Sequence, residues 1–166
     1  GEMIEKFGTE EQQHYFLPKL TSGEKPVGSF CLSEPHSGSD AAALSAKAVR
    51  DGDNYILNGT KMWVTSGAHC SVALVMARTG EHKNRGISTF LIEADNPGFI
   101  AAKAEDKMGL RGSNTAAITL EDCVVPAHCR LGDEGIGFKV AMTALDGGRV
   151  GIGAQALGIA RTALSV

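Results

Sequence analysis

The sequence predicts a mainly β fold with flanking helices, in which an antiparallel β-barrel or sandwich is followed by a long helix. Between residues 27 and 126, short apolar runs alternate with turn residues, and no helical pattern separates them. After Pro126 the pattern changes to a long apolar segment without proline. Many short strands with closely spaced turns are typical of antiparallel barrels and sandwiches.

The first 26 residues are predicted to be helical. Thr9 is followed three residues later by Gln12, which fits a capping box and predicts that a helix begins near Glu10. We expect Pro18 to break this helix near Leu17, because proline lacks the N–H donor and its ring clashes with the preceding turn.

Eight short runs between turn residues are predicted strands. They cover residues 27–32, 44–50, 55–57, 61–65, 72–78, 87–93, 99–103 and 116–125. Asp51-Gly52 and Asn58-Gly59 predict two-residue hairpin turns, because both positions of a type I′ turn need a positive φ. The second turn would connect the strands at 55–57 and 61–65.

Residues 136–164 are predicted to form one long helix despite their glycine content. Each glycine costs about 1 kcal/mol relative to alanine in a helix interior. Gly147, Gly151, Ala154 and Gly158 fall on one face of such a helix. This stripe of small residues permits the close approach of another helix or of a ligand, and the sequence leaves both alternatives open.

The composition excludes several classes of protein. With 43% hydrophobic and 21% charged residues, the chain has the composition of a soluble globular protein. A net charge of −3 with scattered basic residues gives no reason to expect nucleic acid. No run approaches the ~20 apolar residues of a membrane span, and residues 1–30 lack the order of a signal peptide. The cysteines lack zinc spacing, so we expect no metal and reduced thiols at Cys31, Cys70, Cys123 and Cys129.

Three segments contain residues suited to binding a ligand. The serine-rich loop at 33–40 offers N–H and hydroxyl donors that can hold a phosphate, although most such turns bind nothing. Trp63 and Thr65 would share one face of a strand and could flank an aromatic cofactor; a core tryptophan is the alternative. Asp146 and Arg149 can pair on a helix surface, and a solvated ion pair is the simplest interpretation.

Four segments resemble the acyl-CoA dehydrogenase family, and together they cover nearly the whole chain. They are FCLSEPHSGSD (30–40), NGTKMWVTSG (58–67), EDKMGLRGSNTAAITLEDCVVP (105–126) and LDGGRVGIGAQALGIARTAL (145–164). The last is most similar to the short-chain, butyryl-CoA branch. The resemblance implies that residues 1–26 end an N-terminal helical domain, 27–130 form the middle β-domain that binds FAD and substrate, and 131–166 begin a C-terminal helical domain.

The resemblance also implies which residues form the site. Those implied to bind the FAD cofactor are Phe30, Leu32, Ser33, Gly38, Ser39, Trp63, Val64 and Thr65. Those implied to contact the acyl-CoA substrate are Ser39, Asp146, Gly147, Gly148 and Arg149. Thr65 would hydrogen-bond N5 of the flavin, the atom that receives the hydride.

The implied activity is FAD-dependent α,β-dehydrogenation of a short-chain fatty acyl-CoA, with electrons passed to an electron-transfer flavoprotein. In the family a glutamate removes the α-proton while a hydride leaves Cβ. Family members carry this glutamate in the C-terminal domain, beyond Val166, or at the position that here reads Gly148. We therefore expect no catalytic residue in this chain, which would be an inactive fragment of a longer protein.

The resemblance further implies a homotetramer for the full-length protein. It implies a cytoplasmic location in a bacterium or the mitochondrial matrix in a eukaryote, without secretion. The sequence leaves two alternative classes of protein open. One is an acyl-CoA oxidase or flavin monooxygenase relative, and the other is a non-catalytic β-barrel binding module.

Overall fold

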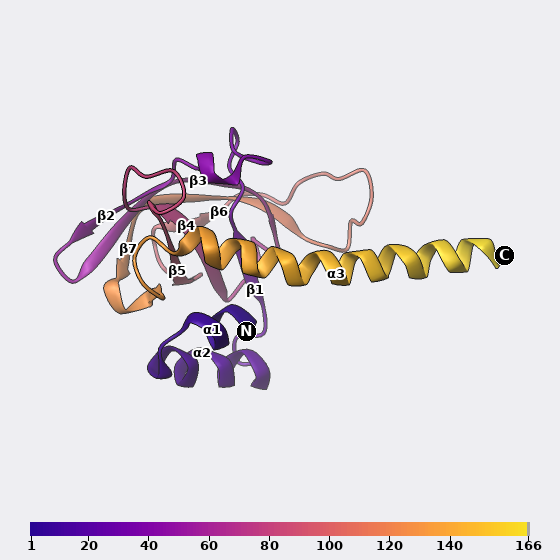
Figure 1. Cartoon of the computed structure of the whole chain (residues 1–166), viewed down its shortest axis with the longest axis horizontal. Coiled ribbons are helices and arrows are strands. Elements are labelled where there is room, and N and C mark those ends of the chain that lie inside the picture. Colours follow the sequence, from indigo (N-terminus) through magenta and orange to yellow (C-terminus); the bar gives the residue numbers. More distant parts are fainter. Residues whose placement is uncertain (166) are drawn as a thin grey trace.

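The computed structural model describes residues 1–165, in which two short helices, a β-sheet and one long helix follow one another (Figure 1). The helices are α1 (Glu2–Phe7), α2 (Glu10–Ser22) and α3 (Gly137–Leu164). The strands are β1 (Gly28–Cys31), β2 (Lys47–Asp51), β3 (Asn54–Thr65), β4 (Val72–Arg78), β5 (Ile87–Glu93), β6 (Phe99–Ala101), β7 (Thr115–Pro126) and β8 (Arg130–Leu131). Two 3₁₀ helices, η1 (Ala41–Ala43) and η2 (Ala127–Cys129), precede β2 and β8. The predicted mainly β fold with flanking helices is confirmed.

All eight strands belong to one sheet, in the order β6-β7-β3-β2-β4-β5-β8 with β1 paired to β4. The sheet is open, so the closed barrel that the sequence allowed does not form within residues 1–165. Antiparallel pairing dominates, but β1 and β2 both run parallel to β4. β1 can pair in this way because residues 32–71 supply the long connection that parallel strands need.

The predicted turn at Asn58-Gly59 is wrong, because β3 continues through both residues. Gly59 has a φ of 148°, and a β-carbon there would lie 2.6 Å from Cβ of Ala46. The glycine therefore permits a close approach between β3 and the residue before β2, and no chain reversal. Asn58 donates to Oδ1 of Asp122 (3.0 Å) and accepts from its N–H (2.8 Å), which joins β3 to β7.

The other predicted hairpin does join β2 to β3, but its turn lies one residue later. Asp51 pairs with Asn54, so Gly52 and Asp53 form the turn. Gly52 has a φ of 55°, whereas Asp53 is not among the residues with a positive φ. A type I′ turn needs a positive φ at both positions, so the expected turn type is wrong.

The N-terminal helices contain the predicted capping box, but the break predicted near Leu17 does not occur in α2. Thr9 Oγ1 accepts from the N–H of Gln12, whose side chain accepts from the N–H of Thr9. The helix α2 nevertheless includes Pro18 and continues to Ser22. Pro18 lies on the exposed side, where water can satisfy the carbonyl that loses its donor, and Thr21 donates to the carbonyls of Leu17 and Pro18.

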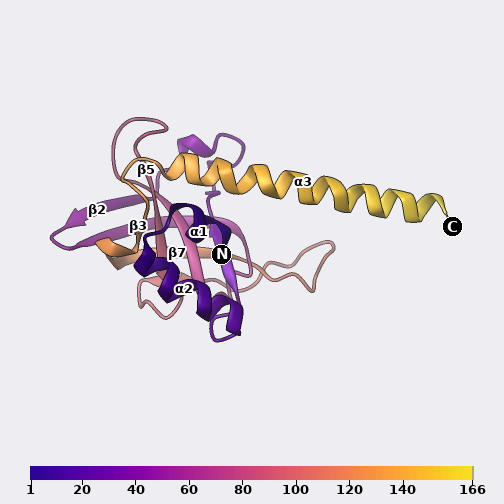
Figure 2. The same ribbon diagram turned by 60° about the horizontal axis from the view of Figure 1, so that its bottom comes forward.

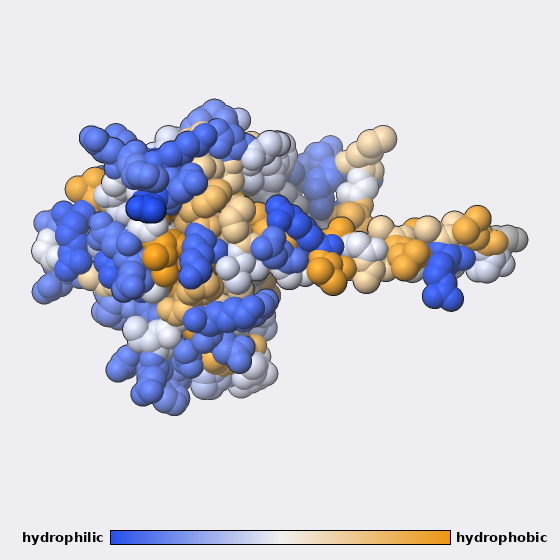
Figure 3. Space-filling model, viewed as in Figure 1, coloured by the Kyte–Doolittle hydropathy of each residue, from blue (hydrophilic) through white to orange (hydrophobic). Residues whose placement is uncertain are grey.

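The predicted long helix is confirmed as α3, and only its first turns pack against the rest of the chain. Gly137, Val140 and Ala141 are buried against the sheet. Farther along, α3 extends away from the rest of the chain (Figures 1 and 2). Apolar side chains remain visible on this distal part (Figure 3), which includes the exposed Val150 and Leu157. Within residues 1–165, no helix is long and apolar enough to cross a membrane.

Candidate functional site

A cavity of about 620 Å³ lies where β1 and the end of β3 meet the first turns of α3. This volume falls within the range of about 300–1,000 Å³ that is usual for ligand pockets. Eight residues of the predicted site line the cavity: Phe30, Leu32, Ser33, Gly38, Ser39, Trp63, Thr65 and Arg149. The fold therefore brings together three segments that are far apart in the sequence.

Trp63 lies on a distorted part of β3. The register between β3 and β7 shifts between Lys61 and Val64, and Trp63 has a φ of 59°. A positive φ is strained for a residue with a large side chain. The distortion leaves Trp63 62% exposed at the cavity while Val64 is buried in the core. Trp63 and Thr65 both line the cavity, so a core tryptophan is excluded.

The loop between β1 and η1 forms the opposite wall of the cavity. Glu34 and Ser37 form an isolated β-bridge, and Ser37 Oγ donates to the carbonyl of Asp40 at 2.7 Å. A β-carbon added at Gly38 would meet nothing within 4 Å, so the backbone there is open to a ligand. Among the hydrogen bonds between described residues, none uses the hydroxyl of Ser33, Ser39 or Thr65. These hydroxyls are thus available to a bound molecule.

A buried ion pair joins the two walls. Lys61 is fully buried, and its Nζ donates to Oε1 of Glu34 at 2.7 Å. The same ammonium donates to the carbonyl of Leu32 at 3.2 Å. Glu34 also accepts from the N–H and hydroxyl of Ser45 and from the N–H of Ala46. No local pattern predicts this pair, because 27 residues separate its members in the sequence.

The ion pair makes the free energy of unfolding depend on pH. Burial alone would raise the pKa of Glu34, but Lys61 and the N–H groups of Ser45 and Ala46 outweigh it and lower the pKa. A carboxylate whose pKa is lower in the folded than in the unfolded state stabilises the fold above its unfolded pKa of about 4.3. That contribution is lost as the pH falls through the folded pKa.

We therefore expect the free energy of unfolding to fall in acid, and to fall less in the double variant Glu34→Gln/Lys61→Met. Urea unfolding at pH 6 and at pH 3.5 measures this difference. Other carboxylates titrate equally in both proteins, so the difference reports the ionic contacts of Glu34, which are Lys61 at 2.7 Å and the imidazole of His36 at 3.6 Å. An identical acid dependence in the two proteins would show that these contacts do not stabilise the Glu34 carboxylate.

The chain is similar in sequence and in fold to known proteins. The family model described as acyl-CoA dehydrogenase, middle domain, matches residues 29–123. The chain belongs to the acyl-CoA dehydrogenase family. No group of three or more His, Cys, Asp or Glu side chains that could hold a metal occurs within residues 1–165 of this family member.

Individual relatives match nearly all of this chain. The human mitochondrial short-chain specific acyl-CoA dehydrogenase is 51% identical over 162 residues, which are 97% of this chain and 39% of the relative. The structure of butyryl-CoA dehydrogenase from Megasphaera elsdenii has a TM-score of 0.94 at 45% identity, covering 99% of this chain and 43% of that one. A chain in a structure of the electron transferring flavoprotein of Acidaminococcus fermentans has a TM-score of 0.92 at 48% identity. This match covers 96% of this chain and 42% of that chain. The chain thus spans about two fifths of the length of these relatives.

The helix α3 contributes both predicted and unpredicted residues to the cavity of about 620 Å³. Arg149 lines the cavity and donates to Oδ1 of Asp146 at 2.6 Å. Asp146 and its neighbours Gly147 and Gly148 do not line it. The unpredicted lining residues on α3 are Phe138, Met142 and Leu145, and Met62 of β3 is a further one. The three on α3 are spaced four and three residues apart, which places them on one helix face.

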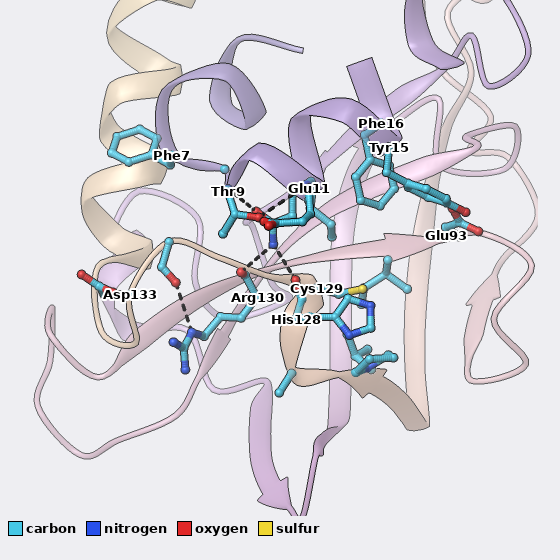
Figure 4. A pocket seen from close by; sticks show the side chains of 18 of the residues that line it. Phe7, Thr9, Glu11, Tyr15, Phe16, Glu93, His128, Cys129, Arg130 and Asp133 are labelled. Atoms are coloured by element: carbon cyan, nitrogen blue, oxygen red, sulfur yellow. Dashed lines mark hydrogen bonds between the residues drawn. The ribbon is translucent and has the colours of Figure 1, made fainter. Parts of the chain in front are cut away.

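A second cavity lies between α2 and the ends of β5 and β7 (Figure 4). Its volume is about 1210 Å³. In it the side chain of Gln12 donates to the carbonyls of His128 (2.6 Å) and Arg130 (2.9 Å), and Tyr15 lies beside Glu93. None of the predicted site residues lines this cavity, so it is separate from the candidate site.

All four cysteines are free thiols, and three of them are buried. Burial raises the pKa of Cys31 to about 12 and that of Cys123 to about 11. The reactive form of cysteine is the thiolate, so these two thiols are inert at neutral pH.

Proposed function

We propose that this acyl-CoA dehydrogenase chain binds FAD in the cavity between β1, β3 and α3. We further propose that the whole protein dehydrogenates short-chain acyl-CoA at the α and β carbons. The observation that carries the proposal is the exposed indole of Trp63, on a strained stretch of β3, beside the free hydroxyl of Thr65. Backbone strain persists where the surrounding structure holds it, and it clusters at functional sites.

The residues around the cavity fit a flavin. A flat, apolar ring system needs flat or apolar walls and hydrogen-bonding groups at its edge. Trp63 and Phe30 supply the apolar surface, and Thr65 and Ser33 supply hydroxyls. The open backbone at Gly38 leaves room for a phosphate to approach closely. When bound, FAD supplies the acceptor for the hydride.

The individual roles follow from this placement. Thr65 would offer a hydrogen bond to N5 of the flavin, with Phe30, Leu32, Ser33, Trp63 and Val64 along the ring. Because Val64 is buried, its contribution would come from its backbone. Gly38 and Ser39 would meet the pyrophosphate, and Ser39 also the thioester. Arg149 would bind the CoA portion of the substrate, with Asp146, Gly147 and Gly148 on the same turn of α3.

The whole protein would have parts beyond this chain. In the proposed division, residues 1–26 end a helical domain, 27–130 form the β-domain, and 131–166 begin a second helical domain. Asp146 is the carboxylate nearest to Gly148 in the sequence, and it is exposed and paired with Arg149. In the proposal it therefore does not serve as the base, and the glutamate that removes the α-proton would lie outside the chain. The proposal includes a homotetramer, an electron-transfer flavoprotein as electron acceptor, and a bacterial cytoplasmic or mitochondrial location.

The test is an absorbance scan of the purified chain, with FAD and then butyryl-CoA added without oxygen. We expect FAD to bind, which shifts its absorbance bands, and to remain oxidised when butyryl-CoA is added. Bleaching by butyryl-CoA would show that a base is present in the chain. Absence of FAD binding would contradict the proposed role of the cavity.

Replacing Trp63 by alanine is expected to weaken FAD binding by about tenfold to a hundredfold. Stacking of a flat base on an aromatic side chain is worth about 1–3 kcal/mol, and each 1.4 kcal/mol is a factor of ten. Quenching of flavin fluorescence measures the dissociation constant. Val49→Ala is the matched control, because Val49 is also an exposed apolar residue (61%) but lies outside the cavity. Equal affinity of Trp63→Ala and the unaltered chain would rule out stacking on Trp63.

A further inference from the structure

We infer that Lys61 and Glu34 are positioning residues, which hold the loop at 33–40 at a fixed distance from the end of β3 and thereby set the width of the flavin cavity. This inference rests on the proposed function, because the width matters only if a ligand binds between the loop and Trp63. Neither side chain lines the cavity. Both would act through the neighbouring residues that do.

The bonds between the two walls are concentrated at one place. Lys61 donates to the carbonyl of Leu32 (3.2 Å) and to Glu34 (2.7 Å). The next residue, Met62, donates its N–H to the carbonyl of Ser33 at 2.8 Å. Three consecutive loop residues are thus bound to two consecutive strand residues, directly before Trp63. Any shift of this part of the loop would move Leu32 and Ser33 relative to the indole.

The carboxylate of Glu34 also fixes the segment that follows the loop. Its Oε2 accepts from the N–H (2.7 Å) and hydroxyl (3.0 Å) of Ser45, and its Oε1 accepts from the N–H of Ala46 at 3.0 Å. The carboxylate therefore holds both ends of the segment that contains Gly38 and Ser39. Between these ends, Lys83 pairs with Asp40 only at the surface, where both side chains are more than half exposed.

Stability alone does not explain a charged pair at this position. Burying two charges costs free energy, and well-packed apolar side chains of similar volume are often as stable or more so. An apolar pair makes no directional hydrogen bonds. Only a donor and an acceptor fix the distances to particular carbonyl and N–H groups. The shift of register after Lys61 allows this side chain to be buried while Trp63, two residues later, is exposed.

The test uses the double variant Glu34→Gln/Lys61→Met, which removes both charges and leaves no single charge buried. Its midpoint of thermal unfolding is expected to stay close to that of the unaltered chain. Hydrogen exchange in a peptide covering residues 33–46 is expected to accelerate at least tenfold without FAD. The dissociation constant for FAD is expected to rise at least tenfold, and the shift of the flavin bands on binding is expected to change.

The matched control is Lys25→Met/Glu93→Gln. Lys25 and Glu93 form an ion pair at 2.9 Å outside the flavin cavity, so its removal is expected to leave FAD affinity and exchange in residues 33–46 unchanged. If the control weakens FAD binding equally, the effect is not specific to the Lys61–Glu34 pair and the inference is wrong.

The remaining outcomes separate the inference from the proposed function. If the unaltered chain binds FAD and the double variant binds it with the same affinity and spectrum, the positioning role is excluded and the proposed function stands. If the double variant does not fold, the pair serves folding and the positioning role is likewise excluded. If the unaltered chain does not bind FAD, the proposed function fails and the inference fails with it.

Discussion

Replacing Lys61 alone by methionine is expected to lower the free energy of unfolding by about 3–5 kcal/mol, because it leaves the carboxylate of Glu34 buried without its counter-charge. The side chain of Glu34 is only 2% exposed, so water cannot take the place of the ammonium. Urea unfolding at neutral pH measures the loss. It is expected to exceed clearly the change in the double variant, in which neither charge remains.

Lys25→Met is the control for the loss of Lys61. Lys25 pairs with Glu93 at 2.9 Å, but both side chains are more than 20% exposed. Ion pairs that water can reach contribute about 0–1 kcal/mol, so this variant is expected to be only slightly destabilised. A loss below about 1 kcal/mol for Lys61→Met would mean that Glu34 becomes protonated or hydrated at little cost, which would contradict the description of the pair as a fixed contact.

Replacing Gly59 by alanine is expected to destabilise the fold by about 3 kcal/mol or more. The new Cβ would lie 2.6 Å from Cβ and 2.7 Å from Cα of Ala46, at a φ of 148° that L-residues rarely adopt. Overpacking costs about 1–3 kcal/mol, and backbone strain adds about 1–3 kcal/mol. Ala46 also donates to Glu34, so a shift to relieve the contact would weaken the ion-pair network.

Thermal and urea unfolding measure the effect of Gly59→Ala. Gly112→Ala is the control, because a β-carbon added at Gly112 would meet nothing within 4 Å and its φ is not in the positive range. That variant is expected to change the free energy of unfolding by less than about 1 kcal/mol. Equal stability of the two variants would show that β3 and Ala46 can separate freely.

Local patterns predicted most of the elements. The capping box at Thr9 and Gln12 formed as expected, and so did the helix after residue 136, because both depend on neighbouring residues only. The error at Asn58-Gly59 has a different origin. The dipeptide has the composition of a turn, but the side chain of Asn58 bonds to Asp122 and Gly59 meets Ala46. Both contacts are with distant segments, and tertiary contacts override local preference.

Half of the residues that line the candidate cavity were predicted from the sequence, whereas the Lys61–Glu34 pair that supports them was not. The loop at 33–40 and the Trp63–Thr65 segment stand out by their residue types, and the fold places them on one cavity. Nothing local indicates that Lys61 is buried, since lysine is almost never fully buried unless it is paired. Only the fold shows that Glu34 is the partner of Lys61. The distortion at Trp63 likewise arises from the shifted register with β7, which no single strand encodes.

The parallel pairing of β1 with β4 has a consequence for the order of folding. β2 and β3 form a hairpin from adjacent residues, and β4 and β5 pair across one loop. β1 instead pairs Gly28 with Val72, with η1, β2 and β3 between them. Non-local pairing closes a long loop and is therefore slow. The wall of the cavity that carries Phe30 is thus expected to form late, so that a partly folded chain has its hairpins but lacks a complete cavity for the proposed FAD.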